Sequence, residues 1–209
     1  AQSPTVFGPG AYVLTVTNPQ NGCKASATAT VTSNTTPPGA TATGGLKTCA
    51  NPTVTLHASS NTSGVSYLWS GSGGFMSNLQ NPTVSLIGSY SVTITNPVNG
   101  CVSSATASVT QNLTPPTVTA TSNTITCNNP MPTLTASSQT TGATFTWTGP
   151  NGFTANIPNP QVSVSGQYTV IATNPLNGCT SFLNIYVYEN TTPPFVYAGE
   201  DRTLNCNFT

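Results

Sequence analysis

The stretch Gly88-Ser-Tyr-Ser-Val-Thr-Ile-Thr-Asn-Pro-Val-Asn-Gly-Cys101 decides the fold of this chain. Tyr90, Val92 and Ile94 alternate with serine and threonine, and this period of two is typical of a β-strand with one buried and one solvated face. An Asn-Gly pair follows the strand, and its glycine supplies the positive φ of a tight hairpin connection. The stretch therefore predicts a strand that leads into a hairpin turn.

The same pattern returns at a fixed spacing of 78 residues. The positions that recur in register are Cys23, Cys101 and Cys179; Pro37, Pro115 and Pro193; Trp69 and Trp147; and Tyr12, Tyr90 and Tyr168. A fixed period of this size is typical of a tandem array of one structural unit.

Further alternating segments precede the deciding stretch in each copy. Their apolar positions are Val54, Leu56 and Ala58, then Val65, Tyr67 and Trp69 in the first copy, and Leu134 and Ala136, then Ala143, Phe145 and Trp147 in the second. We expect about seven antiparallel strands per unit, with the tryptophan on the third and the tyrosine on the sixth, as in an immunoglobulin-like sandwich. The predicted fold class is all-β, with tandem immunoglobulin-like β-sandwich repeats in an extended array.

The register of the repeat also predicts the domain boundaries. Residues 1–34 match the C-terminal part of a truncated repeat, and residues 193–209 match the N-terminal part of the next one. Two complete repeats are expected between them, at 36–113 and 114–191. Each is near the lower end of domain size, where a covalent staple helps a thin core.

A Pro-Pro pair stands at each boundary between repeats, in Asn34-Thr-Thr-Pro-Pro, Asn112-Leu-Thr-Pro-Pro and Asn190-Thr-Thr-Pro-Pro. Consecutive prolines favour an extended, semi-rigid conformation and cannot donate ladder hydrogen bonds. We therefore expect a rod with stiff joints.

Charged residues make up only 3% of the chain, against roughly 25% in ordinary soluble domains. Such a surface offers no electrostatic footprint for nucleic acid and no basic face for an anionic membrane. No stretch approaches the roughly 20 apolar residues of a membrane span. We expect no nucleic-acid partner and no direct membrane insertion.

The cysteines fall into two classes. One class follows the Asn-Gly pair and the other ends the first strand: Cys23, Cys101 and Cys179, and Cys49, Cys127 and Cys206. Regularly spaced structural cysteines indicate disulfides and an oxidising compartment, so the protein is expected to be extracellular, at the cell surface.

Three disulfide pairing schemes respect the repeat. Cys49 could join Cys101 within a unit, Cys23 could join Cys49 across a linker, or Cys49 could join Cys179 across a junction. In a sandwich the two ends of the within-unit pair lie about 25 Å apart for an eight-residue strand, whereas a disulfide needs Cα atoms within about 7 Å. Within-unit pairing is nevertheless the commoner habit of small secreted domains. The within-unit and junction schemes both stay open, and the linker scheme is disfavoured.

Groups that could carry chemistry are scarce. The one histidine, His57, and Asp201 lie in different units, so we expect no catalytic residues and no enzyme. No Cys-x-x-Cys pair indicates zinc. The two complete units hold one acidic residue, Glu189, which is too few carboxylates for calcium. No metal and no cofactor are expected.

Aromatic residues supply the candidate binding surface. Phe182, Tyr186 and Tyr188 alternate on the outward side of the last strand of the second unit, and the first unit has no such residues there. Packing against a neighbouring unit explains them equally well. Phe75 and Phe153 each follow a Gly-rich turn and are candidates for stacking on sugars, although packing over the core is favoured by their fixed spacing.

Five Asn-x-Thr/Ser triplets fit the pattern of N-glycosylation. They begin at Asn34, Asn61, Asn112, Asn190 and Asn207.

The deciding stretch, its copies ending at Cys23 and Cys179, and Ala198-Gly-Glu-Asp-Arg-Thr-Leu-Asn-Cys206 resemble the tandem Ig-like or PKD-like repeats of giant surface proteins of Bacteroidetes. They are most similar to SprB-type gliding adhesins and related proteins exported by the type IX system. The resemblance implies cell-surface display, adhesion to surfaces or polysaccharide, and gliding motility. The chain lacks the acidic residues that many PKD-like repeats carry.

The favoured function is a non-catalytic cell-surface adhesin or stalk segment made of rigid, disulfide-stapled repeats. Its expected partners are surface polysaccharide or an abiotic surface, and weak contacts along the array would add up through effective concentration. One alternative is a structural subunit of an extracellular filament or sheath, in which the partners are neighbouring chains of the same protein. Another is a carbohydrate-binding module of a larger secreted enzyme.

Overall fold

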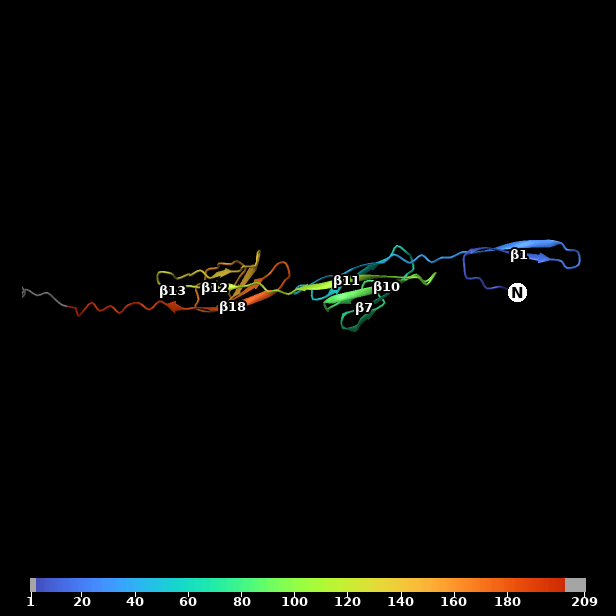
Figure 1. Cartoon of the computed structure of the whole chain (residues 1–209). Coiled ribbons are helices and arrows are strands. Elements are labelled where there is room, and N and C mark those ends of the chain that lie inside the picture. Colours follow the sequence, from blue (N-terminus) through green and yellow to red (C-terminus); the bar gives the residue numbers. More distant parts are fainter. Residues whose placement is uncertain (1–2, 202–209) are drawn as a thin grey trace, which may run out of the picture. The chain divides into compact units, whose positions relative to one another are not determined.

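The computed structural model describes residues 3–201 (Figure 1). Two compact units divide the chain: the first contains the residues up to Lys47 together with Pro52–Gln111, and the second contains Thr48–Asn51 together with the residues from 112 onward. Each unit is a two-layered β-sandwich with its own hydrophobic core. The predicted all-β, immunoglobulin-like fold class is confirmed. Cys206 and Asn207 lie outside the described residues.

The main sheet of the first unit has five strands in the order β4-β11-β10-β7-β8. These strands are β4 (Gly45–Thr48), β11 (Val102–Asn112), β10 (Gly88–Thr95), β7 (Ser66–Gly71) and β8 (Phe75–Ser77). The second layer pairs β3 (Thr41–Thr43) with β6 (His57–Ser59), and β5 (Val54–Thr55) with β9 (Thr83–Val84). When β3 with β4 and β5 with β6 are each counted as one interrupted strand, the unit has the seven strands expected.

The first strand is interrupted at Gly44, between β3 and β4. A side chain there would collide with the backbone of Ser108 on β11, so only glycine allows this close approach. The chain consequently leaves β6 and continues along β11 in the other sheet. This change of sheet carries the end of the first strand to Thr48.

The core of the first unit is built around Trp69, which is completely buried. Val92 on β10 lies opposite Trp69 on β7, and Leu56 and Tyr90 complete the centre of the cluster. The indole N–H of Trp69 donates to the carbonyl of Gln80, 3.2 Å away, so its one polar group is satisfied. The predicted alternation of buried and solvated positions is thus observed.

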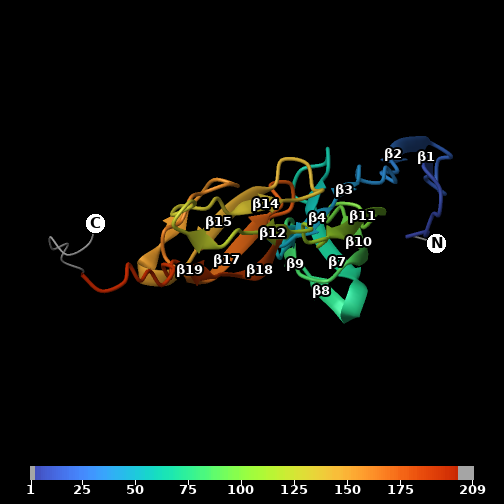
Figure 2. The ribbon, with the colours of Figure 1, turned by 90° about the vertical axis from the view of Figure 1, so that its left-hand side faces the viewer.

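The second unit repeats this arrangement, with Trp147 in its core. Figure 2 shows its strands from a second side. Its main sheet has the order β16-β15-β17-β18, formed by β16 (Thr154–Ala155), β15 (Thr144–Thr148), β17 (Gly166–Thr173) and β18 (Thr180–Val187). The second layer pairs β12 (Thr119–Thr121) with β14 (Thr135–Ser137). One pair departs from the antiparallel prediction, because β13 (Ile125–Thr126) runs parallel to β19 (Glu189–Asn190). The cause is the same change of sheet, which lays the end of the first strand beside the last.

A tyrosine hydroxyl donates to the backbone carbonyl four residues earlier in the hairpin and in both units. The hydroxyl of Tyr90 donates to the carbonyl of Leu86, that of Tyr168 to Val164 and that of Tyr12 to Gly8, each at 2.8 Å. A tyrosine bonded to backbone a few residues upstream is a hallmark of immunoglobulin-like sandwiches. Burial raises the pKa of the Tyr168 hydroxyl above its ordinary value.

Near the start of the chain, β1 (Gly10–Thr17) and β2 (Lys24–Val31) form one antiparallel hairpin. Short 3-10 turns, η1 (Ser72–Gly74) and η2 (Pro150–Gly152), occupy the predicted Gly-rich turns after the tryptophan strands.

Candidate functional site

The Asn-Gly-Cys turn of the second unit, residues 174–179, is closed by its own backbone. The Asn174 N–H donates to the carbonyl of Cys179 at 2.9 Å, and the Gly178 N–H donates to the carbonyl of Asn174 at 2.8 Å. Gly178 has φ 69°, the positive value predicted for this glycine. The connection between β17 and β18 is therefore rigid, although it is longer than a two-residue hairpin turn.

The side chain of Asn177 ties this turn to the linker that precedes the unit. Its Nδ2 donates to Oδ1 of Asn112 at 3.0 Å and to the carbonyl of Thr114 at 2.9 Å, while its Oδ1 accepts from the N–H of Cys179 at 2.9 Å. Asn177 is only 1% exposed, so these bonds satisfy a polar side chain that burial would otherwise penalise. The linker is thus held by a specific contact in addition to its prolines.

The same contact recurs in the first unit. Nδ2 of Asn99 donates to Oδ1 of Asn34 and to the carbonyl of Thr36, both at 3.0 Å, and its Oδ1 accepts from the N–H of Cys101 at 3.0 Å. This contact of the turn asparagine was not predicted from the sequence. The signal was present, because the turn asparagine and the linker asparagine both recur with the repeat and stand 65 residues apart in each copy.

A disulfide joins Cys49 to Cys179, with their Cα atoms 5.0 Å apart. Beside it, the Ala50 N–H donates to the carbonyl of Asn177 at 3.0 Å. We call this disulfide, the Ala50–Asn177 hydrogen bond and the bonds from Asn177 to the linker the clasp. The observed pair is that of the junction scheme. The within-unit pair with Cys101 and the linker pair with Cys23 are not formed.

The segment that carries Cys49 is a compact turn. The Thr48 N–H donates to the carbonyl of Asn51 at 2.9 Å, and the Asn51 N–H donates to Oγ1 of Thr48 at 3.0 Å. The neighbouring residues Lys47 and Pro52 belong to the first unit, whereas Thr48–Asn51 belongs to the second. The clasp therefore holds Thr48–Asn51 in the second unit, although the residues on both sides of this segment in the sequence belong to the first unit.

The other predicted disulfide cysteines differ in accessibility. Within residues 3–201, Cys23 and Cys127 are exposed, Cys101 is half-buried, and none of the three forms a disulfide. The Cys127 thiol lies 3.8 Å from the carbonyl of Thr191.

Gly178→Ala is expected to lower the free energy of unfolding more than Gly100→Ala does. Both glycines have positive φ, so both substitutions carry a backbone strain of roughly 1–2 kcal/mol. A Cβ on Gly178 would also lie 2.6 Å from Cβ of Ala50, whereas one on Gly100 would meet nothing within 4 Å. The additional overpacking should cost about 1–3 kcal/mol.

Denaturant unfolding of the two variants measures this difference, and Gly100→Ala is the matched control. Equal losses of stability at the two positions would show that Ala50 does not cover Gly178.

Of the predicted aromatic residues, Phe182 and Tyr186 lie on the outward face of the main sheet of the second unit, and Tyr188 directly follows the last strand of that sheet. Phe182 is 70% exposed and stands opposite Ile171 on β17, and Tyr186 is 53% exposed. Tyr188 is 65% exposed, with its ring centroid 4.8 Å from that of Tyr186. We call Ile171, Phe182, Tyr186 and Tyr188 the aromatic face. The corresponding positions of the first unit are Thr93, Ser104, Ser108 and Thr110.

Phe75 and Phe153 pack against the core. The ring of Phe75 meets Tyr90 edge-on with centroids 5.5 Å apart, and that of Phe153 meets Tyr168 in the same way at 5.4 Å. Both rings are half-buried, which is the packing alternative weighed above. A hollow of about 200 Å³ adjoins Phe75.

Four of the predicted glycosylation sites lie within the described residues. Asn34, Asn61 and Asn190 are exposed, and Asn112 is half-buried. Oδ1 of Asn61 accepts from the N–H of Gly39 at 2.9 Å. Glycosylation at these positions stays a prediction.

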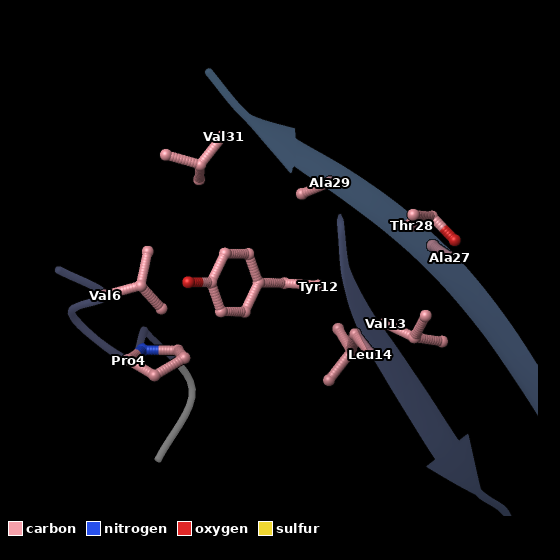
Figure 3. A pocket seen from close by; sticks show the side chains of 9 residues that line it. All are labelled: Pro4, Val6, Tyr12, Val13, Leu14, Ala27, Thr28, Ala29 and Val31. Atoms are coloured by element: carbon pink, nitrogen blue, oxygen red, sulfur yellow. The ribbon is translucent and has the colours of Figure 1, made fainter. Parts of the chain in front are cut away.

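A hollow of about 520 Å³ lies on one face of the β1-β2 hairpin (Figure 3). Tyr12 lies at its centre, and its other lining residues are Pro4, Val6, Val13, Leu14, Ala27, Thr28, Ala29 and Val31. One period later, Tyr12 and Val31 correspond to Tyr90 and Val109, which are buried in the core. The hollow therefore corresponds to the side of the first unit's main sheet that faces its core.

Titratable groups are dispersed over the described chain. His57 is exposed on β6, and Asp201 is exposed near the end of the described range. Residues 3–201 hold no group of three or more His, Cys, Asp or Glu residues that could bind a metal ion. Glu189 accepts hydrogen bonds from the hydroxyls of Ser165 and Thr191 at 3.1 and 3.2 Å.

Across residues 3–201, no helix has the length and apolar character needed to cross a membrane.

No protein-family model matches this chain, and no curated protein matches it. Among solved structures, it is similar to murine CEACAM1b at 14% identity, covering 73% of this chain and 100% of that one, with a TM-score of 0.33. It is also similar to three N-terminal domains of the bacteriophage RB49 highly immunogenic outer capsid protein, at 13% identity, 73% and 59% coverage and a TM-score of 0.44. Extracellular domains 3–5 of Drosophila OTK match at 10% identity, 88% and 72% coverage and a TM-score of 0.36. The fold assignment rests on the sheets and cores described above.

Proposed function

We propose that this chain is a segment of a non-catalytic, extracellular adhesin or stalk, displayed at a cell surface. The observation that carries the proposal is the aromatic face, which leaves large apolar side chains in water on a sheet face whose other outward residues are threonine, asparagine and glutamine. Contiguous exposed apolar side chains typically mark contact surfaces. Surface polysaccharide or an abiotic surface is the proposed partner.

The clasp supports the stalk part of this proposal. A disulfide that links distant parts of the chain persists in an oxidising, extracellular compartment. In the proposed array, residues 36–113 and 114–191 are complete repeats, and residues 1–34 and 193–209 are parts of the repeats on either side. The clasp would then connect each repeat covalently to the next.

The resemblance of the Asn-Gly-Cys stretches carries a finer proposal. We place the chain among the tandem repeats of giant Bacteroidetes adhesins exported by the type IX system, with gliding motility as a role. The Thr- and Ser-rich, nearly uncharged surface suits adhesion that depends little on salt.

Replacing Phe182 and Tyr186 by serine is expected to reduce attachment of chain-coated beads to polysaccharide-coated or bare glass under flow by roughly tenfold. Many chains act together on each bead, so a small loss of affinity per chain is multiplied. The first unit already has serine at the corresponding positions, Ser104 and Ser108, so the fold should tolerate the change.

The matched gain-of-contact variant carries Ser104→Phe and Ser108→Tyr, and its beads should attach more strongly than those of the parent chain. Circular dichroism of each variant checks the fold. Attachment that is the same for all three proteins would sink the adhesion proposal.

The aromatic face also favours a second candidate, a filament or sheath subunit in which Phe182 and Tyr186 are buried between chains. This candidate predicts self-association at micromolar concentration, and a monodisperse monomer in light scattering would count against it. The carbohydrate-binding module has less support, because Phe75 and Phe153 are packed on tyrosine rings.

A further inference from the structure

We propose that the Asn-Gly-Cys turn of the first unit, residues 96–101, is a docking site for the Thr-Cys-X-Asn turn of another repeat of this kind, and that docking ends in a disulfide at Cys101. The template for the docked state is the clasp, in which Thr48–Asn51 lies on the turn 174–179. The proposal goes beyond adhesion, because it concerns how repeats recognise one another.

We call residues 96–101 of the first unit the receiving turn. Its backbone hydrogen bonds are the same as those of the occupied turn, residues 174–179 of the second unit. Its Asn96 N–H donates to the carbonyl of Cys101 at 2.9 Å, and its Gly100 N–H donates to the carbonyl of Asn96 at 2.9 Å. The corresponding distances in the occupied turn are 2.9 and 2.8 Å. Asn99 is bonded to its linker as Asn177 is. The site is thus preorganised, which lowers the entropic cost of docking.

The occupied turn is covered by another segment of the chain at its glycine, and the receiving turn is not. Ala50 covers Gly178 so closely that a Cβ on this glycine would be 2.6 Å from that of Ala50, whereas a Cβ on Gly100 would face open space. Cys179 is buried and Cys101 is only half-buried. The first unit therefore presents the same surface and the same sulfur position, accessible to an incoming segment.

We call Thr48–Asn51 the inserted turn. A second turn of the same kind lies at residues 126–129, and its cysteine, Cys127, forms no disulfide. At residues 126–129 the Thr126 N–H donates to the carbonyl of Asn129, and the Asn129 N–H donates to Oγ1 of Thr126, both at 3.1 Å. These are the bonds that shape Thr48–Asn51. Cys127 is exposed at the tip of this turn. The receiving turn and the inserted turn thus each have their internal hydrogen bonds without being joined to a partner. The partner that the receiving turn recognises is a Thr-Cys-X-Asn turn.

The bond forms by thiol–disulfide exchange. The Cys101 thiol loses its proton to solvent, and the thiolate attacks the partner cysteine, which is held as a mixed disulfide with a small thiol. A sulfur–sulfur bond forms between Cys101 and the partner, and the small thiol leaves as a thiolate with the electron pair. A low-molecular-weight disulfide, which first forms the mixed disulfide, supplies the oxidising equivalent.

The test uses a synthetic peptide of residues 45–52, Gly-Leu-Lys-Thr-Cys-Ala-Asn-Pro, whose cysteine is a mixed disulfide with thionitrobenzoate. The full chain carries serine at Cys23, Cys127 and Cys206, so that Cys101 is its reactive thiol. Release of thionitrobenzoate gives the rate, and peptide mapping confirms the bond to Cys101. We expect this peptide to react roughly five- to thirtyfold faster than one of the same composition in shuffled order, since one or two docking contacts of about 1 kcal/mol each are gained.

Two controls make the test decisive. A chain that keeps Cys127 in place of Cys101 should react with both peptides at the same rate, because residues 126–129 form an inserted turn and not a receiving one. Gly100→Ala, with its fold checked by tryptophan fluorescence, should abolish the preference at Cys101, because its Cβ would occupy the place of the Ala50 counterpart. Equal rates of the two peptides at Cys101, the same preference at Cys127, or a preference that survives Gly100→Ala would each overturn the proposal. None of these outcomes bears on bead attachment, so the two proposals fail separately.

Discussion

Replacing Trp147 by alanine is expected to lower the free energy of unfolding of the second unit by about 3–5 kcal/mol. The indole is completely buried at the centre of that unit's core, and its N–H is bonded to the carbonyl of Pro158 at 3.4 Å. A loss of this size is a large part of the roughly 5–15 kcal/mol that stabilises a typical domain. The second unit should therefore be largely unfolded in mild denaturant.

The same variant shows whether the two cores are independent. The chain has two tryptophans, so Trp69 becomes the sole tryptophan and its fluorescence reports the first unit alone. Its unfolding midpoint in guanidinium chloride should stay at the value of the parent chain, while circular dichroism shows the earlier loss of the second unit. Thr146→Ala, at the exposed neighbouring position on β15, is the control and should change stability by less than about 0.5 kcal/mol. A large shift of the Trp69 transition would contradict separate cores.

Removing the disulfide by Cys49→Ser together with Cys179→Ser is expected to lower the free energy of unfolding by about 2–4 kcal/mol. The bond spans 130 residues, and closing so long a loop restricts the unfolded chain strongly. The double substitution avoids leaving a new thiol at a buried position. Guanidinium chloride unfolding, followed by circular dichroism, measures the change.

Two comparisons control this experiment. The parent chain in reducing agent should match the double variant, and Cys127→Ser should leave stability unchanged, because Cys127 is exposed and unbonded in the structure. If reduction left the parent chain's stability unaltered, the bond between Cys49 and Cys179 would not be contributing.

The strands and both cores could be predicted from the sequence because they follow from local patterns. Alternation placed Val92 and Ile94 inside, and the repeat showed that Trp69 and Tyr90 occupy equivalent core positions in each unit. Each of these features depends on residues close in sequence or on the period itself. The candidate aromatic residues were found for the same reason, since Phe182 breaks the repeat on an outward-facing position.

The clasp could be predicted only in part, because it depends on contacts between residues far apart in the sequence. The expected straight first strand is interrupted at Gly44, and the chain changes sheets there, so no strand length counted from the sequence could decide between the pairing schemes. From the sequence, the asparagine of the turn is recognised only as the neighbour of a positive-φ glycine. Its side-chain bonds to the linker, such as that from Asn177 to Asn112, require the folded unit to bring them together.

Peptide mapping of the unreduced protein tests the clasp most directly. Because lysine and arginine are so few, digestion with pepsin at acidic pH is the suitable choice, and the low pH also suppresses disulfide exchange. We expect a disulfide-linked peptide pair that contains Cys49 and Cys179. Finding Cys49 joined to Cys101 or to Cys23 instead would contradict it.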